Sequence, residues 1–282
     1  MVRSGRNYEL FIDLKSARPD LPRQTVLIRP PIRITFSGSK SVAGGLNRID
    51  LEVYNLAEDK RLAIAEDPEE DKNTSLQLSV GYGTNLEPLF RGTIYRAENA
   101  RDGAEIITSI ECVDGGFDYQ FSETDRTVAA GADPVTAILK DMPNTERGFI
   151  RQRQPLQRPK VMSGRSAREL DKIVEDDEFW FILDGRLNII QEGQSIGGTI
   201  PLVSPATGLL ETPTREQQIV TFRTQFNPSV KAGGLLELES TLAPQMNGAY
   251  QARTITYDGD LDGDSWEMEV EAHSTTRPET LG

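Results

Sequence analysis

Four aspartates at alternate positions form the sharpest pattern of side chains that could do chemistry. With a glutamate five residues further on, they match the spacing of an EF-hand loop, whose oxygens converge on one calcium ion: Asp258, Asp260, Asp262, Asp264 and Glu269. An EF-hand has a helix on each side of its loop, whereas both flanks here alternate apolar and polar residues, as strands do. We therefore interpret the run as a hairpin loop, and a calcium-dependent binding module that uses the four aspartates stays as an alternative.

The remaining candidates for catalysis are an acidic run and two solitary side chains. Residues 175–178 are all acidic, and Glu175 or Asp177 could serve a hydrolase of the cell wall, but adjacent acids after a helix are typical of a solvated turn. His273 and Cys112 are the only histidine and cysteine, which excludes a histidine-rich metal centre and an internal disulfide. We expect His273 in an exposed tail past the last strand and Cys112 in the core. The sequence therefore favours a protein that is not an enzyme, with no catalytic residue, cofactor or metal.

Length and charge narrow the class of protein further. A chain of 282 residues favours about two domains. Its net charge of −13 disfavours tight binding to a nucleic-acid backbone, which needs clustered basic residues. No apolar run approaches the roughly 20 residues of a membrane span. The N-terminal segment lacks the apolar core of a signal peptide, because the charged Glu9 and Asp13 interrupt it. We expect a soluble product made in the cytoplasm, without membrane insertion.

Alternation of apolar and polar residues is the dominant pattern, and it predicts a mainly β fold with minor α. Residues 76–82 and 266–272 are clear examples of half-buried strands. Asp184-Gly185 lies between the apolar runs 179–183 and 186–190, which predicts a hairpin with a type I′ turn.

Two segments interrupt this alternation and predict short helices. In the first, Asp133 is a suitable N-cap, Pro134 suits the first helical position, and apolar residues follow at helical spacing as far as Met142. In the second, Ser166 and Glu169 fit a capping box, with the serine as the cap. Between the two helices, residues 147–168 are rich in arginine, proline and glutamine. We interpret this stretch as a solvated loop, and docking of an acidic partner stays as the alternative.

The predicted elements divide the chain into three units, at residues 1–118, 119–198 and 199–282. The first and third are β-rich and present four strands in a similar order and spacing, which suggests a structural repeat. The main difference between them is an acidic insert at residues 66–71 of the first unit. The middle unit is α+β, with both helices and the hairpin.

Several segments together resemble the baseplate hub proteins of contractile-tailed bacteriophages, the family that includes the late control D proteins. Their order and spacing, from about Asn47 to Ala272, carry the resemblance more than any one segment does. The segments are a strand closed by Asn-Leu at 49–56, a strand with Gly-Tyr at 78–83 followed by Phe-x-Gly-x-Ile at 90–94, the approach to the second helix at 163–167, residues 207–213, and Asn227-Pro228 with Gly233, Tyr250, Gly259-Asp260 and Trp266.

The resemblance implies a structural protein of the virion, placed in the tail baseplate and assembled in the host cytoplasm. Such hubs carry two tube-like β-barrel domains per chain, so that a homotrimer adapts the six-fold tail tube to the three-fold central spike. The implied partners are the tail-tube protein, the spike protein and other baseplate proteins, while DNA passes through without specific binding. The hub of a contractile injection machine that is not a phage shares this fold and stays as an alternative.

One strand face is a candidate for the channel wall of such a ring. Glu267, Glu269 and Glu271 alternate with the apolar residues of the last strand, so they share one face. An acidic wall would repel passing DNA and keep it from adhering. A strand face turned to solvent is the alternative interpretation.

Overall fold

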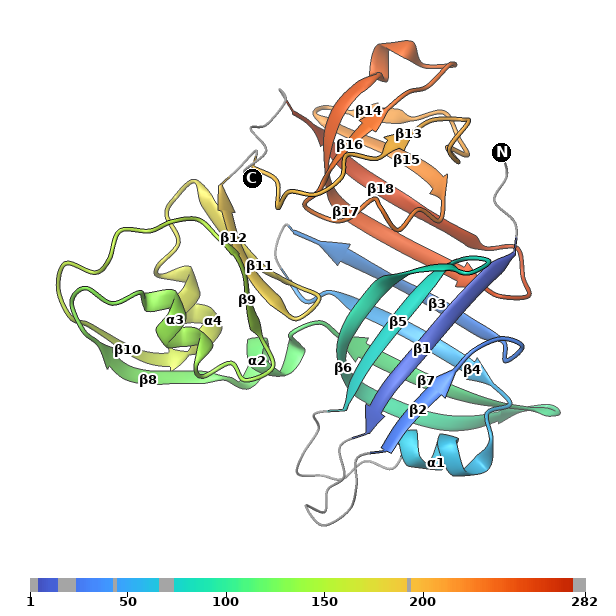
Figure 1. Cartoon of the computed structure of the whole chain (residues 1–282), viewed down its shortest axis with the longest axis horizontal. Helices are drawn as coiled ribbons and strands as arrows, with labels where there is room; N and C mark the ends of the chain where they lie inside the picture. Colours follow the sequence, from blue (N-terminus) through green and yellow to red (C-terminus); the bar gives the residue numbers. More distant parts are fainter. Residues whose placement is uncertain (1–4, 15–23, 43–44, 66–73, 192–193, 276–282) are drawn as a thin grey trace.

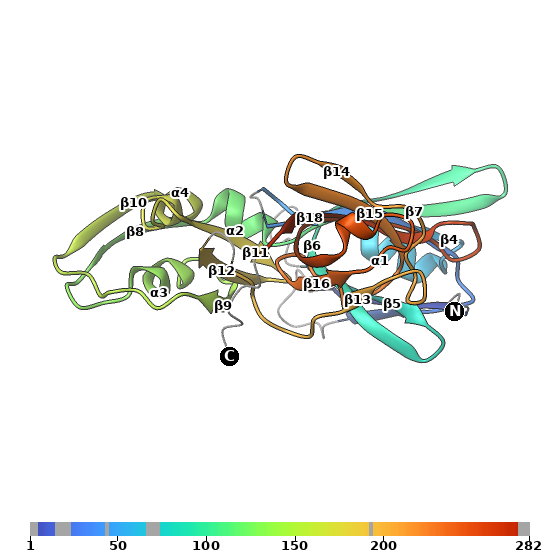
Figure 2. The ribbon, with the colours of Figure 1, turned by 90° about the horizontal axis from the view of Figure 1, so that it is seen from above.

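The computed structural model of the chain describes residues 5–14, 24–42, 45–65, 74–191 and 194–275. Within them the protein is mainly β with minor α, as predicted. Most strands belong to one large sheet, and a smaller group of helices and strands lies to one side of it (Figures 1 and 2). The acidic insert predicted at residues 66–71 lies outside the described residues.

In its described residues, the first part of the chain contains seven strands and one helix. Its members are β1 (Arg6–Leu14), β2 (Gln24–Ile28), β3 (Ile34–Ser41), β4 (Arg48–Tyr54), α1 (Glu58–Ala65), β5 (Ser75–Tyr82), β6 (Asn85–Asp102) and β7 (Glu105–Val113). The strand predicted at 76–82 is therefore confirmed to within a residue.

The described residues of the middle part form three helices and two small sheets. Its members are α2 (Gly116–Phe121), β8 (Glu123–Val128), α3 (Pro134–Leu139), β9 (Glu146–Ile150), β10 (Lys160–Arg165), α4 (Ser166–Asp171), β11 (Glu178–Leu183) and β12 (Arg186–Gln191). The β11–β12 hairpin is confirmed, and Asp184 and Gly185 both have the positive φ, 53° and 73°, that a type I′ turn requires. The start of the helix after Asp133 is also confirmed, because the Asp133 side chain caps it by accepting a hydrogen bond from the Val135 amide, whereas the helix ends at Leu139 and does not reach Met142.

Two expectations for the middle part are wrong. Ser166 is not the cap of α4: it is the first helical residue, and its hydroxyl bonds Thr124 Oγ1 of β8 at 2.9 Å. The buried tertiary partner outcompetes the local capping bond. Nor is 147–168 a solvated loop, because it contains part of β9 and all of β10, and its Arg153 is paired with Glu178.

The last part returns to the large sheet. Its members are β13 (Leu202–Val203), β14 (Thr214–Glu216), β15 (Ile219–Gln225), β16 (Leu235–Leu238), a short 3₁₀ helix (Pro244–Met246), β17 (Gly248–Asp260) and β18 (Trp266–Ser274). A ladder between β17 and β3, from Thr254 opposite Ser41 to Asp260 opposite Thr35, joins this part to the first one. The two β-rich parts therefore share one continuous sheet, in the order β14-β15-β18-β17-β3-β4-β7-β6-β5-β1-β2.

The strand order inside the large sheet repeats. The first part contains the run β4-β7-β6-β5, and the last part contains β15-β18-β17-β16, with the four strands in the same chain order. Each run also has a bulge at the same place: the register shifts at Tyr95 in β6 and at Arg253 in β17. Aligned at their bulges, the two runs place Cys112 with Ala272, both buried, and Glu111 with Glu271.

The apolar residues that alternate along these strands form the main core, which spans both β-rich parts. The middle part has its own cluster, centred on Ile138, Met162 and Leu170. The β11–β12 hairpin belongs to both cores, since Phe181 packs into the main core and Ile182 into the smaller one. The opposite sides of one hairpin thus fix the middle part against the large sheet.

Candidate functional site

The large sheet presents one polar face that crosses both β-rich parts. Residues directly opposite each other on antiparallel strands lie on the same face of a sheet. The register carries one row of such residues across seven strands, from β15 to β6: Gln225, Glu267, Asp258, Ser37, Asp50, Glu111 and Arg96. We call this side of the sheet the polar face.

Acidic side chains outnumber basic ones on the polar face. The acidic members include Asp50, Glu52, Glu98, Glu111, Asp258, Glu267, Glu269 and Glu271, and the basic members include Arg48, Arg96 and Arg223. The three glutamates singled out in the sequence are therefore part of a larger acidic surface.

Local ion pairs hold part of this surface. Arg223 pairs with Glu267, while Glu269 and Glu271 are exposed. Arg48 pairs with both Asp50 and Glu111 at 3.0 Å. The net charge of the polar face stays negative after these pairs are formed.

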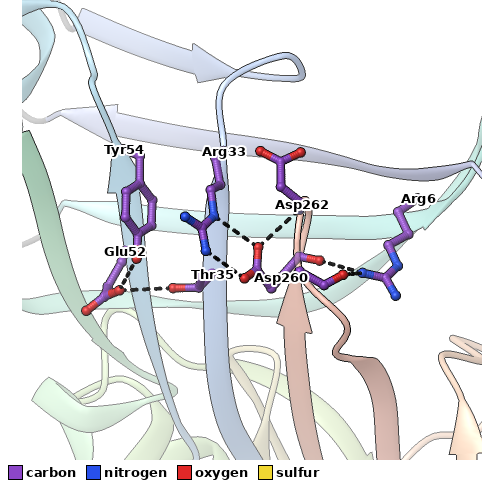
Figure 3. Close-up of polar contacts among 8 residues, drawn as sticks. Arg6, Arg33, Thr35, Glu52, Tyr54, Asp260 and Asp262 are labelled. Atoms are coloured by element: carbon purple, nitrogen blue, oxygen red, sulfur yellow. Dashed lines mark hydrogen bonds and ion pairs between the residues drawn. The ribbon is translucent and has the colours of Figure 1, made fainter. Parts of the chain in front are cut away.

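The end of β17 at Asp260 and the loop that leads to β18, residues 261–265, are held by two arginines from the first part of the chain (Figure 3). Arg33 donates to both carboxylate oxygens of Asp260, at 3.2 and 2.8 Å, and these bonds lower the pKa of Asp260. Arg6 donates to the carbonyl oxygens of Asp260, Gly263 and Asp264. These contacts therefore fasten the end of β17 to β1 and to the residue that precedes β3.

The same contacts bear on the calcium alternative. The loop is flanked by strands β17 and β18, and Glu269 lies in the middle of β18, with Thr256 and Arg223 opposite. A calcium ion would need oxygens that the two arginines now use. Among the described residues, no three His, Cys, Asp or Glu side chains are grouped in a way that could hold a metal ion.

The other side chains singled out in the sequence lie apart from the polar face or have structural partners. Glu178 is buried and paired with Arg153, and Asp177 accepts a hydrogen bond from Gln191. His273 lies within β18, opposite Ile219 of β15, so its placement in a tail past the last strand is wrong. Cys112 is fully buried, as predicted, and its burial raises the pKa of the thiol.

Sequence reasoning missed a buried charge cluster where the three parts meet. Lys40 of β3, with a side chain only 5% exposed, donates to Asp184 of the β11–β12 turn at 2.5 Å. Asp114, just after β7, is buried and accepts hydrogen bonds from the amides of Asp184 and Gly185. Burial raises the pKa of Asp114 from 3.8 to about 6, and the nearby Lys40 opposes part of that rise. The available signal was a lysine at an apolar position of an alternating strand.

Comparison with known proteins decides the family. The model of one family, described as baseplate hub gp41, matches residues 17–270. The chain belongs to this baseplate hub family. A baseplate hub has a structural role in the virion tail and assembles with other tail and baseplate proteins. No curated protein matches the hub chain.

Solved structures show that the hub shares its fold with tail proteins at low sequence identity. A 43 kDa tail protein of prophage MuSo2 from Shewanella oneidensis is 10% identical, with a TM-score of 0.61 over 95% of the hub and 96% of that chain. A tail protein from Neisseria meningitidis is 9% identical, with a TM-score of 0.60 over 96% of the hub and 97% of that chain.

A third solved structure comes from a secretion machine. It is an Escherichia coli component of the type VI secretion system, itself described as similar to the T4 tail proteins gp27 and gp5. That protein is 12% identical to the hub, with a TM-score of 0.61 over 88% of the hub and 75% of that chain. Within the described part of the hub, no helix is both long and apolar enough to cross a membrane.

Proposed function

We propose that three copies of this hub form a ring that adapts the six-fold tail tube to the three-fold central spike and lets DNA pass through its centre. The observation that carries the proposal is the repeated run of four strands, β4-β7-β6-β5 and β15-β18-β17-β16, in one sheet. Two similar units per chain give six units in a ring of three copies, which is the symmetry that the adaptor needs. Residues 1–118 and 199–282 are the proposed tube-like barrel domains, and 119–198 is the smaller domain beside the ring.

The open edges of the sheet support a joint between copies. Within the chain, the bulged strand of the last part, β17, pairs after its bulge with β3. The counterpart of β17 in the first part is β6. Among the described residues, β6 pairs from Arg96 onward with β7 alone, so its other edge is open. The counterpart of β3 is β14, and within the described residues it pairs with β15 alone. An unpaired edge is a template for another strand. By this equivalence, β14 of one copy pairs with β6 of the next, and Thr214 lies opposite Ala100.

The polar face supplies the proposed channel wall. If each copy turns its polar face inward, the exposed Glu269 and Glu271 face the passing DNA. Like charges on DNA and wall prevent adhesion during passage. The core and the middle domain then lie outside the channel.

Ring formation is tested by electron microscopy and native mass of the hub mixed with its neighbouring tail proteins, together with a disulfide crosslink. The pair Thr214→Cys and Ala100→Cys should form an interchain bond that yields covalent trimers on a non-reducing gel. A matched pair, Thr214→Cys with Glu123→Cys, places the second thiol on β8 and should not crosslink. A compact monomer in every mixture, or equal crosslinking of both cysteine pairs, would refute the proposal that the hub forms a ring.

The channel wall is tested separately by neutralising three glutamates. The variant Glu267→Gln, Glu269→Gln, Glu271→Gln should assemble normally but alter DNA delivery, measured as genome release or infectivity of purified virions. A matched variant, Glu58→Gln, Asp59→Asn, Glu123→Gln, removes three charges away from the polar face and should deliver DNA normally. Loss of ring formation in the first variant would show that these residues serve assembly instead.

The likeness to a type VI secretion component supports a second candidate, the hub of a contractile injection machine that carries no genome. Purified particles separate the two functions. Detection of the hub in tailed particles that contain DNA supports the phage hub, and detection only in sheathed particles without DNA supports the second candidate.

A further inference from the structure

A cleft of about 590 Å³ opens where the three parts of the chain meet, and the proposed ring does not account for it. One wall comes from β5 and β6 through Gln77 and Arg91, and a second from β9 and β12 through Phe149 and Arg186. A turn at residues 228–232 closes the third side. Because hydrogen bonds from Lys40 and the Arg91 amide to Asp184 tie two of these walls together, the cleft is formed in advance of any ligand.

The charge of the cleft is opposite to that of the whole chain. Five basic side chains line it against one acidic side chain, Asp184: Lys40, Arg91, Arg147, Arg186 and Lys231. The chain as a whole has 31 basic and 44 acidic residues. A basic cleft on so acidic a protein selects for a negatively charged ligand.

Two of these cations are available to a ligand. Arg91 and Lys231 are exposed, and neither side chain has an ion-pair partner among the described residues. Arg147 and Arg186 are also exposed, but they share their charge with Asp133 and Glu146. The rim thus carries unneutralised positive charge on both the β6 side and the side of the 228–232 turn.

The floor of the cleft is apolar. Leu89, Leu183 and Val230 line it and are buried, with Phe149 half-buried beside them. Tyr257 also lines it, and is only 4% exposed, yet its hydroxyl has no hydrogen-bond partner within the described part of the chain. A ligand that fits therefore combines acidic groups with an apolar side chain and an acceptor for this hydroxyl.

The cleft lies on the side of the sheet opposite the polar face. Lys40 alternates along β3 with Ser39 and Ser41, and Tyr257 alternates along β17 with Thr256 and Asp258, which belong to the polar face. If the polar face lines the channel, the cleft opens outside it, where DNA does not pass. An apolar floor is also a poor surface for phosphates, so the observations favour a peptide.

We propose that this cleft docks an acidic peptide segment, with an apolar side chain between its carboxylates, from a neighbouring baseplate protein. The apolar side chain enters the floor between β6 and the 228–232 turn, and the flanking carboxylates pair with Arg91 and Lys231. The inference rests on the proposed function only for the source of the segment, since the binding itself needs a single folded hub chain.

The test is fluorescence anisotropy of a fluorescein-labelled peptide of alternating glutamate and leucine, titrated with the full-length hub. We expect saturable binding that added sodium chloride weakens. The variant Arg91→Gln, Lys231→Gln should weaken it by about tenfold. The matched variant Lys140→Gln, Arg158→Gln removes one lysine and one arginine, both exposed, away from the cleft and should bind as the wild type does.

The controls define what would overturn the proposal. A peptide with serine in place of leucine should bind less tightly, and one with glutamine in place of glutamate should not bind. Absence of binding, equal losses in the two double variants, or a single-stranded oligonucleotide that binds more tightly than the peptide would each overturn it. Native mass of the same variants with the tail proteins shows whether the ring still forms, so the two proposals can fail independently.

Discussion

Replacing Lys40 by methionine should destabilise the hub, and more strongly at neutral than at acidic pH. The lysine is buried where the three parts of the chain meet, and its charge opposes the rise in the pKa of the buried Asp114. Methionine keeps the volume and the apolar stem but removes the charge. Asp114 and Asp184 then face each other without a cation between them.

The magnitude follows from the pKa of Asp114. The native state holds its proton up to about pH 6, whereas the unfolded chain releases it near 3.8, so this group makes stability fall as the pH rises from 3.8 through 6. At about 1.4 kcal/mol for each tenfold change in proton affinity, the rise corresponds to about 3 kcal/mol with Lys40 in place. Without Lys40 the native pKa of Asp114 rises further, and the decline extends above pH 6. Breaking a buried pair costs about 3–5 kcal/mol, and the exposure of Asp184 places this site at the lower end.

Urea denaturation followed by tryptophan fluorescence, repeated between pH 5 and 8, measures this effect. We expect Lys40→Met to lose about 3 kcal/mol at pH 7.5 and about half of that at pH 5, where Asp114 is already protonated. Adding Asp114→Asn to the variant should remove the extra pH dependence. Parallel curves of stability against pH for the wild type and Lys40→Met would refute the reasoning.

Three further outcomes test the fold around the polar face. Arg33→Leu should lower the free energy of unfolding by about 1 kcal/mol, because it breaks the two-point contact with Asp260, whereas Arg29→Leu, which breaks a more exposed pair, should change it by less than about 0.5 kcal/mol in urea denaturation. Gly92→Ala should cost about 1–3 kcal/mol in the same assay, since the added methyl group would lie 2.5 Å from the Val113 carbonyl oxygen. Millimolar calcium should shift the melting temperature by less than about 1 °C, because arginines already hold the loop oxygens, and a larger rise would revive the calcium alternative.

Local patterns predicted the elements whose cause is local. The β11–β12 turn follows from Asp184-Gly185, and the start of α3 from Asp133 and Pro134, because these residues decide the backbone of their own segment. The alternation along β18 likewise predicted that Glu267, Glu269 and Glu271 share one face.

Tertiary partners decided what the sequence could not show. Ser166 fits a capping box, but its hydroxyl is hydrogen-bonded to the hydroxyl of Thr124, 42 residues earlier in the chain. Lys40 and Asp184 are 144 residues apart, so no local pattern joins them. The acidic surface around the three glutamates was missed for the same reason, since it depends on the register of ladders such as β17 with β3. Periodicity indicates that a strand has a polar face, but the pairing of strands in the sheet decides which side chains of other strands lie beside that face.

If three copies form the proposed ring, the ladder between β3 and β17 within each chain would also determine how that ring comes apart. Strands tethered in one polypeptide meet at a high effective concentration that dilution does not change. A ring of three copies would have six contacts between neighbouring β-rich units, three within chains and three between copies. Dilution could break only the three contacts between copies. The two kinds of unit would also alternate strictly around the ring, because each chain contains one unit of each kind, joined covalently in a fixed order.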